Sequence, residues 1–321
     1  MGSAIGVNME YRSIGRVTGS VGGFYTVVLS DDGSPLANST VACRAKGAFR
    51  HEKISPLVGD NVVVRYDDTN LDKEPDILLD EILERKNSLI RPPLANLDII
   101  FVTLAAASPE PSLFTADKLI SICEFNKIEP VIVIGKCELN RELADKIEKI
   151  YTLAGYNVFV LSCFENEGIE NIKKYVEENL KGRIAAFAGV SGAGKSTLLN
   201  RLFPSLELST GEVSRRTERG KHTTRTVKLF SACGGYIADT PGFSMLDFER
   251  FDFFGKEDLP GTFREFDDCI GNCRYTKCTH TKEDGCAVLE KLRNGQIAPS
   301  RHESFLALYD ILKQKHGWDS K

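Results

Sequence analysis

The chain has 321 residues, enough for two or three domains, and 42% of them are hydrophobic, as in proteins that bury sizeable cores. With 41 basic and 45 acidic residues the net charge is -4, which excludes a polycation that holds nucleic acid by overall charge alone. No apolar run approaches the roughly 18–20 residues of a membrane span, and no secretory segment opens the sequence. We therefore expect a cytoplasmic protein with no membrane partner.

Short alternating strands separated by glycine turns fill the N-terminal part of the chain. The expected strands are two within 15–29, then 41–45 and 58–66. Their size and pattern predict an all-β barrel of the oligonucleotide-binding (OB) type over residues 10–84. The basic and aromatic segment 47–53 suits an RNA contact, although a barrel with no ligand of its own fits the same pattern. Residues 1–9 are interpreted as a cloning remnant or a disordered start.

Buried strands alternate with helices from residue 85 to residue 247. This alternation predicts an α/β domain with a parallel sheet that is covered on both faces. The expected strands are 97–104, 130–134, 158–161, 183–188 and 236–238. The expected helices are 115–126, 141–154, 168–180 and 197–202.

A phosphate-binding motif follows the expected strand at 183–188. The run Gly189-Val190-Ser191-Gly192-Ala193-Gly194-Lys195-Ser196-Thr197 fits GxxxxGK[ST]. Its glycines allow backbone N–H groups to face a polyanion, and the helix that follows adds the positive end of its dipole. We expect Lys195 to reach the β- and γ-phosphates of a nucleotide and Ser196 to ligate Mg²⁺.

Two later segments have the residues that would surround a γ-phosphate. Residues 239–242 read Asp-Thr-Pro-Gly and match DxxG after an apolar strand. Asp239 would hold Mg²⁺ through water, and the Gly242 N–H would bond the γ-phosphate. Upstream, Thr224 would complete the Mg²⁺ shell, with Thr223 as the alternative. The expected magnesium ligands are Ser196, Thr224 and Asp239.

The base-reading segment precedes the phosphate loop instead of following it. Gly135-Lys136-Cys137-Glu138 comes after a buried strand and departs from the guanine motif Asn/Thr-Lys-x-Asp. Glu138 keeps the acceptor oxygens but is one methylene longer, and Gly135 supplies no amide. We therefore predict weakened guanine binding or discrimination. Ser162 and Cys163 occupy the place where a backbone N–H usually meets the guanine carbonyl.

This order of motifs indicates a circularly permuted P-loop GTPase domain. Hydrolysis of GTP requires a water molecule held in line with the γ-phosphate. Ras-like enzymes orient that water with a glutamine just after DxxG, but here Phe243 follows, and a phenyl ring cannot orient water. His222 is the local candidate, and a surface histidine or a group from a partner are the alternatives. The expected catalytic residues are His222, Lys195 and Thr224.

The C-terminal part, residues 248–321, is rich in cysteine and then helical. The chain has nine cysteines, and without a secretory signal clustered cysteines are more often metal ligands than disulfides. The spacing C-x4-C-x-H-x5-C predicts a closed tetrahedral shell for one structural zinc ion per chain. Its expected ligands are Cys273, Cys278, His280 and Cys286. Cys269 is the alternative to Cys273 as first ligand.

Taken together, these motifs resemble the bacterial RsgA family, also called YjeQ or YloQ. The resemblance begins near residue 11 and includes 91–98, the phosphate loop, 220–224, 239–243 and the zinc spacing. It implies an OB barrel over 10–84, a circularly permuted GTPase domain over 85–247 and a zinc-binding, mainly helical domain over 248–321. It also implies a monomer that hydrolyses GTP with Mg²⁺, is stimulated by the small ribosomal subunit and its rRNA, and leaves the subunit on hydrolysis.

Two other functions fit parts of the sequence. The first is an rRNA-binding assembly protein whose nucleotide site is a relic, against which the intact Lys195, Ser196, Asp239 and Gly242 argue. The second is a phosphotransferase that uses the loop on another nucleotide, which no acceptor-site motif supports. Phosphate release from GTP and from ATP, with and without small subunits, separates these functions.

Overall fold

A computed structural model describes residues 9–47, 49, 54–67, 77–90, 92–204, 227–239 and 254–315. The chain forms two compact units. The first unit comprises Met1–Leu97, His222–Ser231 and Tyr236–Pro241. The second comprises Asp98–Lys221, Ala232–Gly235 and Gly242–Lys321. Each unit has its own hydrogen-bonded strands and its own core.

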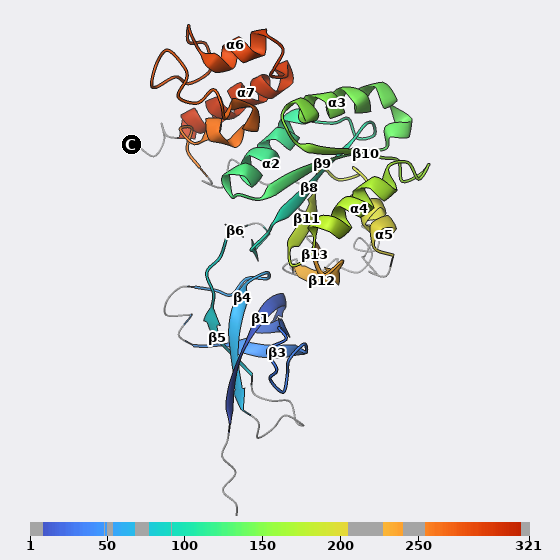
Figure 1. The fold of residues 1–321 in the computed structure, drawn as a ribbon, viewed down its shortest axis with the longest axis vertical. Helices are drawn as coiled ribbons and strands as arrows, with labels where there is room; N and C mark the ends of the chain where they lie inside the picture. Colours follow the sequence, from blue (N-terminus) through green and yellow to red (C-terminus); the bar gives the residue numbers. More distant parts are fainter. Residues whose placement is uncertain are drawn as a thin grey trace, which may run out of the picture. The chain divides into compact units, whose positions relative to one another are not determined.

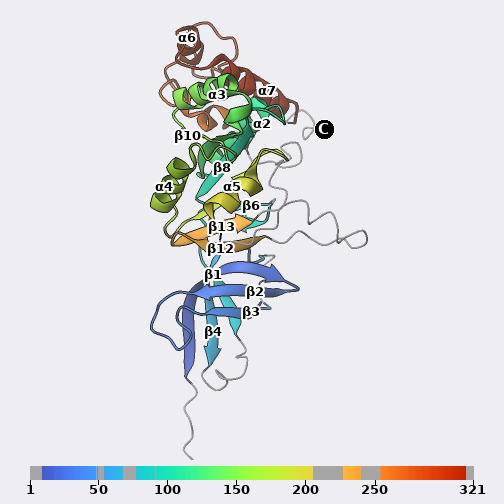
Figure 2. The same ribbon diagram turned by 90° about the vertical axis from the view of Figure 1, so that its right-hand side faces the viewer.

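Within the described residues, five strands of the first unit close a barrel (Figure 2). They are β1 (Glu10–Val21), β2 (Phe24–Leu29), β3 (Thr40–Ala45), β4 (Asn61–Asp67) and β5 (Leu78–Ile82). Hydrogen bonds join them in the order β1-β2-β3-β5-β4. Strand β4 returns to β1 as an antiparallel partner, from Glu10↔Asp67 to Arg16↔Asn61. The predicted all-β barrel of OB type is confirmed.

The barrel core follows from the alternation of side chains along each strand. In β4, Val62, Val64 and Tyr66 point inward and are buried, while the residues between them are partly exposed. Similar alternation in the other strands supplies Val17, Val27, Leu29, Val41, Cys43 and Leu79 to the same core. The interior of the short barrel is therefore filled by these packed side chains.

A short hairpin, β6 (Ser88–Leu89) and β7 (Leu94–Ala95), is fixed to the turn before β4. A Cβ atom on Gly59, which has φ +93, would lie 2.0 Å from the Ala95 carbonyl oxygen, so this contact requires glycine. The fully buried Asp60 carboxylate accepts hydrogen bonds from Arg85 Nε at 2.7 Å and Nη2 at 2.8 Å. Two more strands, β12 (Lys228–Ala232) and β13 (Gly235–Asp239), follow later in the chain, and β12 pairs with β1 at Gly19↔Lys228.

A parallel sheet forms the centre of the second unit. Its strands are β8 (Ile99–Ala105), β9 (Glu129–Gly135), β10 (Asn157–Val160) and β11 (Ile184–Ala188), in the order β10-β9-β8-β11. All residues of β8 and of β11 are buried, which explains their uninterrupted apolar sequences. The bounds of these strands lie within two residues of the predicted ones, so the predicted parallel sheet is confirmed.

Helices cover both faces of this sheet. They are α2 (Leu113–Phe125), α3 (Arg141–Leu153), α4 (Ile169–Asn179) and α5 (Lys195–Leu202). Figure 1 shows α2 and α3 on one side of the sheet and α4 and α5 on the other. Because parallel strands all end at the same edge, the loops after β8, β9, β10 and β11 lie near one another there.

The C-terminal segment packs against α2. It contains the 3-10 turns η3 (Leu259–Thr262) and η4 (Arg264–Phe266) and the helices α6 (Ala287–Arg293) and α7 (Pro299–Lys315). Phe263 and Phe266 stack with ring centroids 5.2 Å apart, and Phe305 of α7 completes this aromatic core. The fully buried Arg301 bonds Asp117 of α2 at 2.6 Å and Glu265 at 2.7 Å, which ties α7 to the sheet domain.

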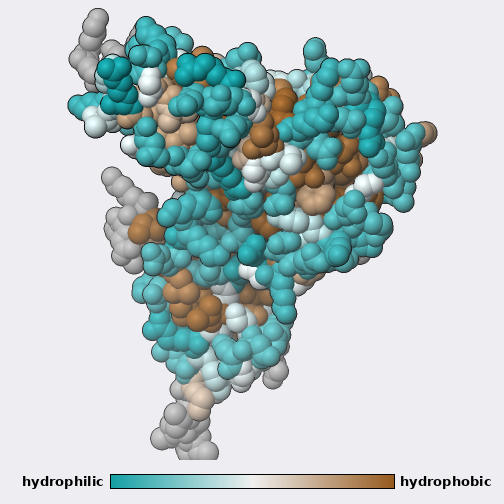
Figure 3. Space-filling model, turned by 45° about the horizontal axis from the view of Figure 1, so that its top comes forward, coloured by the Kyte–Doolittle hydropathy of each residue, from teal (hydrophilic) through white to brown (hydrophobic). Residues whose placement is uncertain are grey.

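The surface is mostly hydrophilic on the face drawn in Figure 3, and the apolar residues gather in separate patches. In the part of the chain that the structure describes, no helix combines the length and the apolar character needed to cross a bilayer.

Candidate functional site

The phosphate loop runs from the end of β11 to the first residue of α5. Gly189, Gly192 and Gly194 have φ values of 147, 82 and 96, a region that favours glycine. A Cβ atom on Gly189 would lie 2.2 Å from the Thr103 carbonyl oxygen, so no larger residue fits there without movement. The loop therefore turns by way of its glycines and presents backbone N–H groups at the N-terminus of α5, which favours an anion.

The Lys195 ammonium lies within the curve of this loop. Its Nζ donates hydrogen bonds to the carbonyl oxygens of Gly189 at 2.6 Å and Val190 at 2.9 Å. Burial lowers the pKa of Lys195, and a polyanion beside it would work in the opposite direction. Ser196 and Thr197 follow on the first turn of α5, where both are exposed. This is the arrangement that the GxxxxGK[ST] motif predicts.

The base-reading segment begins where β9 ends. Gly135 is buried, and Lys136 adopts a left-handed conformation with φ 58 before the 3-10 turn η1 (Cys137–Leu139). Lys136 Nζ donates to the carbonyl oxygen of Ser108, and Cys137 N donates to Leu161 O at 3.3 Å. Among the described residues, the Oε2 atom of Glu138 has no hydrogen-bond partner although it is shielded from solvent. A buried acceptor of this kind is costly unless a ligand satisfies it.

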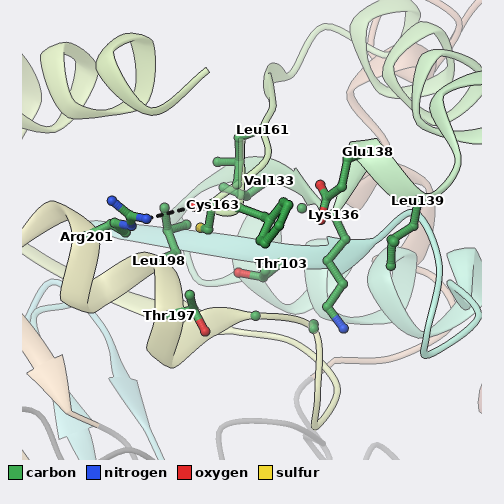
Figure 4. Close-up of a pocket in the computed structure, with 14 residues that line it drawn as sticks. Thr103, Val133, Lys136, Glu138, Leu139, Leu161, Cys163, Thr197, Leu198 and Arg201 are labelled. Atoms are coloured by element: carbon green, nitrogen blue, oxygen red, sulfur yellow. Dashed lines mark hydrogen bonds between the residues drawn. The ribbon is translucent and has the colours of Figure 1, made fainter. Parts of the chain in front are cut away.

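A pocket of about 590 Å³ joins this segment to the phosphate loop (Figure 4). Lys136, Glu138 and Leu139 line one side, and Arg201 of α5 lies on the opposite side. The remaining lining residues come from the strands, from the loops after β10 and β11 and from α5: Thr103, Val133, Gly135, Leu161, Cys163, Phe164, Ala193, Gly194, Thr197 and Leu198. The volume and the mainly apolar lining are typical of a small-ligand site.

The loop after β10 makes the outer wall of the pocket. Ser162 N donates to Glu167 O and Glu167 N to Ser162 O, both at 3.0 Å, while the Ser162 hydroxyl accepts from Glu165 N at 3.0 Å. Ser162 therefore holds the turn together, and only Cys163 of the predicted pair lines the pocket. Arg201 Nη2 donates to the Cys163 carbonyl oxygen at 3.1 Å, which joins this loop to α5.

An ion pair fixes the two base-side loops to each other. Arg141 Nη1 lies 2.5 Å from Glu167 Oε1, and Glu167 Oε2 lies 3.6 Å from the Cys137 sulfur. Arg141 begins α3, just after the base-reading segment, while Glu167 ends the turn after β10. Sequence reasoning missed this pair because the partners lie 26 residues apart. It also missed Phe164, which lines the pocket. The position of Phe164 directly after Cys163 was the one feature of the sequence that could have indicated this.

The magnesium and catalytic residues are described only in part. Asp239 ends β13 in the first unit, and burial raises its pKa while Lys228 opposes that change. His222, Thr223, Thr224 and Gly242 lie outside the described residues. Their proposed roles at the γ-phosphate therefore stay predictions.

The cysteine cluster is assembled as a metal centre. Among the described residues, Cys273, Cys278, His280 and Cys286 bring their ligand atoms within 4.8 Å of one another. The sulfurs of Cys273 and Cys286 each lie 3.5 Å from His280 Nδ1 and 4.0 Å from each other. A tetrahedral zinc ion with bonds of about 2.0–2.3 Å separates its ligands by about 3.5–4 Å. The four side chains thus fit one structural zinc ion.

The surrounding chain holds these ligands in place. Ala287 N donates to the Cys273 sulfur at 3.4 Å, and the ring nitrogen Nε2 of His302 lies 2.9 Å from the His280 carbonyl oxygen. His280 has φ 58, a conformation that this contact from α7 supports. The Cys269 sulfur instead lies 3.7 Å from Asp268 Oδ1.

Comparisons with known proteins agree with this geometry. The family model of the RsgA GTPase matches residues 82–249, and that of the RsgA N-terminal domain matches residues 14–71. The chain is 40% identical to the small ribosomal subunit biogenesis GTPase RsgA of Caldanaerobacter subterraneus, over 95% of this chain and 97% of that protein. The RsgA protein of Enterococcus faecalis is also 40% identical, over 91% and 93%.

Two solved structures share the fold. YloQ, described as a circularly permuted GTPase, superposes with a TM-score of 0.75 and 30% identity, over 95% of this chain and 96% of that chain. YjeQ from Thermotoga maritima superposes with a TM-score of 0.76 and 32% identity, over 94% and 99%. The chain is therefore a member of the RsgA GTPase family.

Proposed function

We propose that this protein is a Mg²⁺-dependent GTP hydrolase that binds the small ribosomal subunit as a monomer in the cytoplasm and assists its late maturation. The subunit stimulates hydrolysis, and hydrolysis releases the protein. The observation that carries the proposal is the phosphate loop, in which Lys195 lies inside the curve and a pocket for a base adjoins it. The names of the relatives, small ribosomal subunit biogenesis GTPases, support the choice of partner.

The phosphate end of the nucleotide is held by main chain and one ammonium. The N–H groups of residues 189–194 and Lys195 Nζ bind the β- and γ-phosphates, and the Gly242 N–H adds a bond to the γ-phosphate. Ser196, Asp239 and Thr224 offer oxygen ligands of the kind that Mg²⁺ prefers. Ser196 is exposed on the first turn of α5. Bound Mg²⁺ supplies neutralisation of the phosphate charge.

Hydrolysis then requires a water molecule oriented toward the γ-phosphate and stabilisation of the charge that develops there. We assign the orientation of this water to His222 and the stabilisation of the developing charge to Lys195. At the other end, Lys136 and Glu138 contact the base, and the loop of Ser162 and Cys163 closes over it. Because Gly135 supplies no side-chain amide and Glu138 is one methylene longer than aspartate, discrimination for guanine is reduced.

The barrel provides a surface suited to rRNA. A hollow of about 620 Å³ on it is lined by three aromatic rings and two basic side chains among others. The Arg44 guanidinium lies 5.0 Å above the half-exposed Phe24 ring. Aromatic rings stack on unpaired bases and guanidinium groups contact phosphates. Replacing both Phe24 and Arg44 by alanine should reduce the stimulation by small subunits but leave the basal rate, and equal stimulation would remove this assignment.

A direct test of the main proposal is phosphate release from GTP and from ATP, each with and without purified small subunits. The parent should release phosphate from GTP faster in the presence of subunits. A Lys195→Ala variant should lose this turnover by roughly 100-fold or more, since it removes a charge contact made in the transition state. Turnover equal to that of the parent would overturn the proposal.

We also propose that Cys273, Cys278, His280 and Cys286 bind one zinc ion per chain as a structural centre. Metal analysis should find one zinc per chain in the parent and much less in Cys278→Ser, with a lower unfolding temperature. The matched control is Cys269→Ser, which should keep its zinc because the Cys269 sulfur faces Asp268. Zinc loss in the control and retention in Cys278→Ser would contradict this ligand set.

A second candidate function rests on the base-reading segment. Gly135 offers no amide and Glu138 is longer than the usual aspartate. These changes fit an rRNA-binding assembly protein with a weakened or relic nucleotide site of relaxed base specificity. The same phosphate-release assay decides, because this candidate predicts similar turnover of ATP and GTP.

A further inference from the structure

Phe164 is an aromatic side chain with almost no protein partner. Its exposed fraction is 86%, higher than that of any other large hydrophobic residue in the described part of the chain. Single exposed apolar residues are common and need no explanation by themselves. Phe164, however, lines the pocket of about 590 Å³ together with Lys136 and Glu138.

The backbone that carries Phe164 is firmly held. The paired bonds between Ser162 and Glu167 close the turn at its base, and the Ser162 hydroxyl accepts from Glu165 N inside it. Arg201 donates to Cys163 O from one side, and the pair of Arg141 with Glu167 ties the turn to α3 from the other. The ring is therefore presented by an ordered turn, although nothing in the described part of the chain covers it.

The opposite wall of the pocket belongs to the phosphate loop. Ala193, Gly194 and Thr197 line the pocket, and Lys195 lies between them in sequence. A nucleotide whose phosphates occupy that loop thus carries its base into the space beside Phe164. The charged groups at this end are few: Lys136 Nζ is already bonded to Ser108 O, while Glu138 Oε2 is without a partner among the described residues.

We propose that Phe164 is the residue that stacks on the nucleobase, and that it contributes affinity that is nearly independent of the identity of the base. The inference rests on the proposed function, since it needs a nucleotide in the phosphate loop. Every base has a π-face, so stacking tolerates a change of base. Discrimination between bases is left to Glu138, whose carboxylate accepts hydrogen bonds that guanine donates and adenine does not offer in the same place. Phe164 therefore sets how tightly a purine nucleotide is held, and Glu138 sets which purine is preferred.

The test uses calorimetric titration of the full chain with three probes: a non-hydrolysable GTP analogue, the matching ATP analogue and inorganic tripolyphosphate. Phe164→Ala should weaken both nucleotide analogues by the same factor, roughly tenfold, and leave tripolyphosphate unchanged. Phe164→Tyr should retain the affinity of the parent. The matched control is Leu153→Ala on α3, a residue that is 49% exposed and lies outside the pocket.

Three results would overturn the inference. Unchanged affinity of Phe164→Ala for both analogues means that the ring does not stack. Equal weakening of tripolyphosphate means that the substitution disturbs the phosphate loop. A loss confined to the GTP analogue means that Phe164 discriminates between bases. In each of these cases the proposed GTPase function survives, whereas a parent that binds none of the three probes removes both.

A spectroscopic readout adds independent support. The only tryptophan of the chain is Trp318, so Phe164→Trp in a Trp318→Phe background places a single indole at the pocket. Its fluorescence should change on addition of either nucleotide analogue and stay constant with tripolyphosphate. A signal that is indifferent to both nucleotides while calorimetry reports binding would count against stacking.

Discussion

The phosphate end and the base end of the nucleotide site are built in opposite ways. At the proposed phosphate end, glycine backbone curves around the Lys195 ammonium, and the Thr103 carbonyl lies so close to Gly189 that no Cβ fits. At the proposed base end, side chains on two loops line the pocket, and two positions of the usual guanine motif are changed. Recognition by backbone permits little variation, whereas recognition by side chains can change without altering the fold.

The largest expected effect comes from replacing Gly189 at the phosphate end. If a larger residue were tolerated there, the contrast between the two ends would disappear. We expect Gly189→Ala to weaken binding of a GTP analogue by about 100-fold, because the new Cβ would displace the loop from the Thr103 carbonyl. Loss of one or two hydrogen bonds to a charged phosphate, at about 1.5–3 kcal/mol each, corresponds to a change of that size. Calorimetric titration measures the affinity. The matched control is Gly155→Ala. Gly155 also has a positive φ, 86, but an added Cβ atom would meet open space there. A Gly189→Ala protein that binds as well as the control would show that the loop adapts.

The second change restores the usual motif at the base end. In Gly135→Asn/Glu138→Asp, we expect the ratio of GTP to ATP affinity to rise about tenfold, since each recovered hydrogen bond contributes about 1–3 kcal/mol. A Cβ on Gly135 would lie 3.4 Å from the Ala193 carbonyl oxygen, so an amide there can reach the phosphate loop. Competition binding with the two nucleotides measures the ratio. Gly135→Ala/Glu138→Asp, which adds a Cβ without the amide, should recover only part of it, and no gain in the full variant would refute the prediction.

The smallest effect concerns the ion pair that joins the two base-side loops. Arg141 and Glu167 are 55% and 42% exposed, so solvent screens the pair and its contribution is small. We expect Arg141→Gln to weaken binding of both nucleotides about twofold to fivefold by loosening the turn of Phe164. Lys146→Gln on the same helix removes a pair with Glu142 that lies outside the pocket and should have no effect. Identical affinities of the two variants would mean that the pair does not position the turn.

The sequence predicted the parts of this molecule that depend on local patterns. The glycines of the phosphate loop, the buried strands β8 and β11 and the spacing of the cysteines each carry their information within a few residues. The four metal-binding side chains meet because three short intervals and the left-handed His280 bring them together.

Features that depend on distant partners could not be predicted. The pairing of β3 with β5, the bond of Lys136 to Ser108 and the pair of Arg141 with Glu167 join segments that no local pattern relates. Phe164 has an ordinary sequence context, and only its exposure beside a pocket distinguishes it. Ser162 and Cys163 were predicted to occupy the place where a backbone N–H usually meets the guanine carbonyl. The Ser162 N–H is donated to Glu167, a contact that becomes evident only in the folded turn.

The buried Arg301 has a consequence for anyone who divides the chain into fragments. Its guanidinium is wholly enclosed between Asp117 of α2 and Glu265 of η4. A shortened protein that stops before α7 would leave both carboxylates in the interior with no counter-ion, and uncompensated buried charge costs several kcal/mol. The last helix is therefore an obligatory part of the catalytic half, and a nucleotide-binding fragment that stays soluble must retain it.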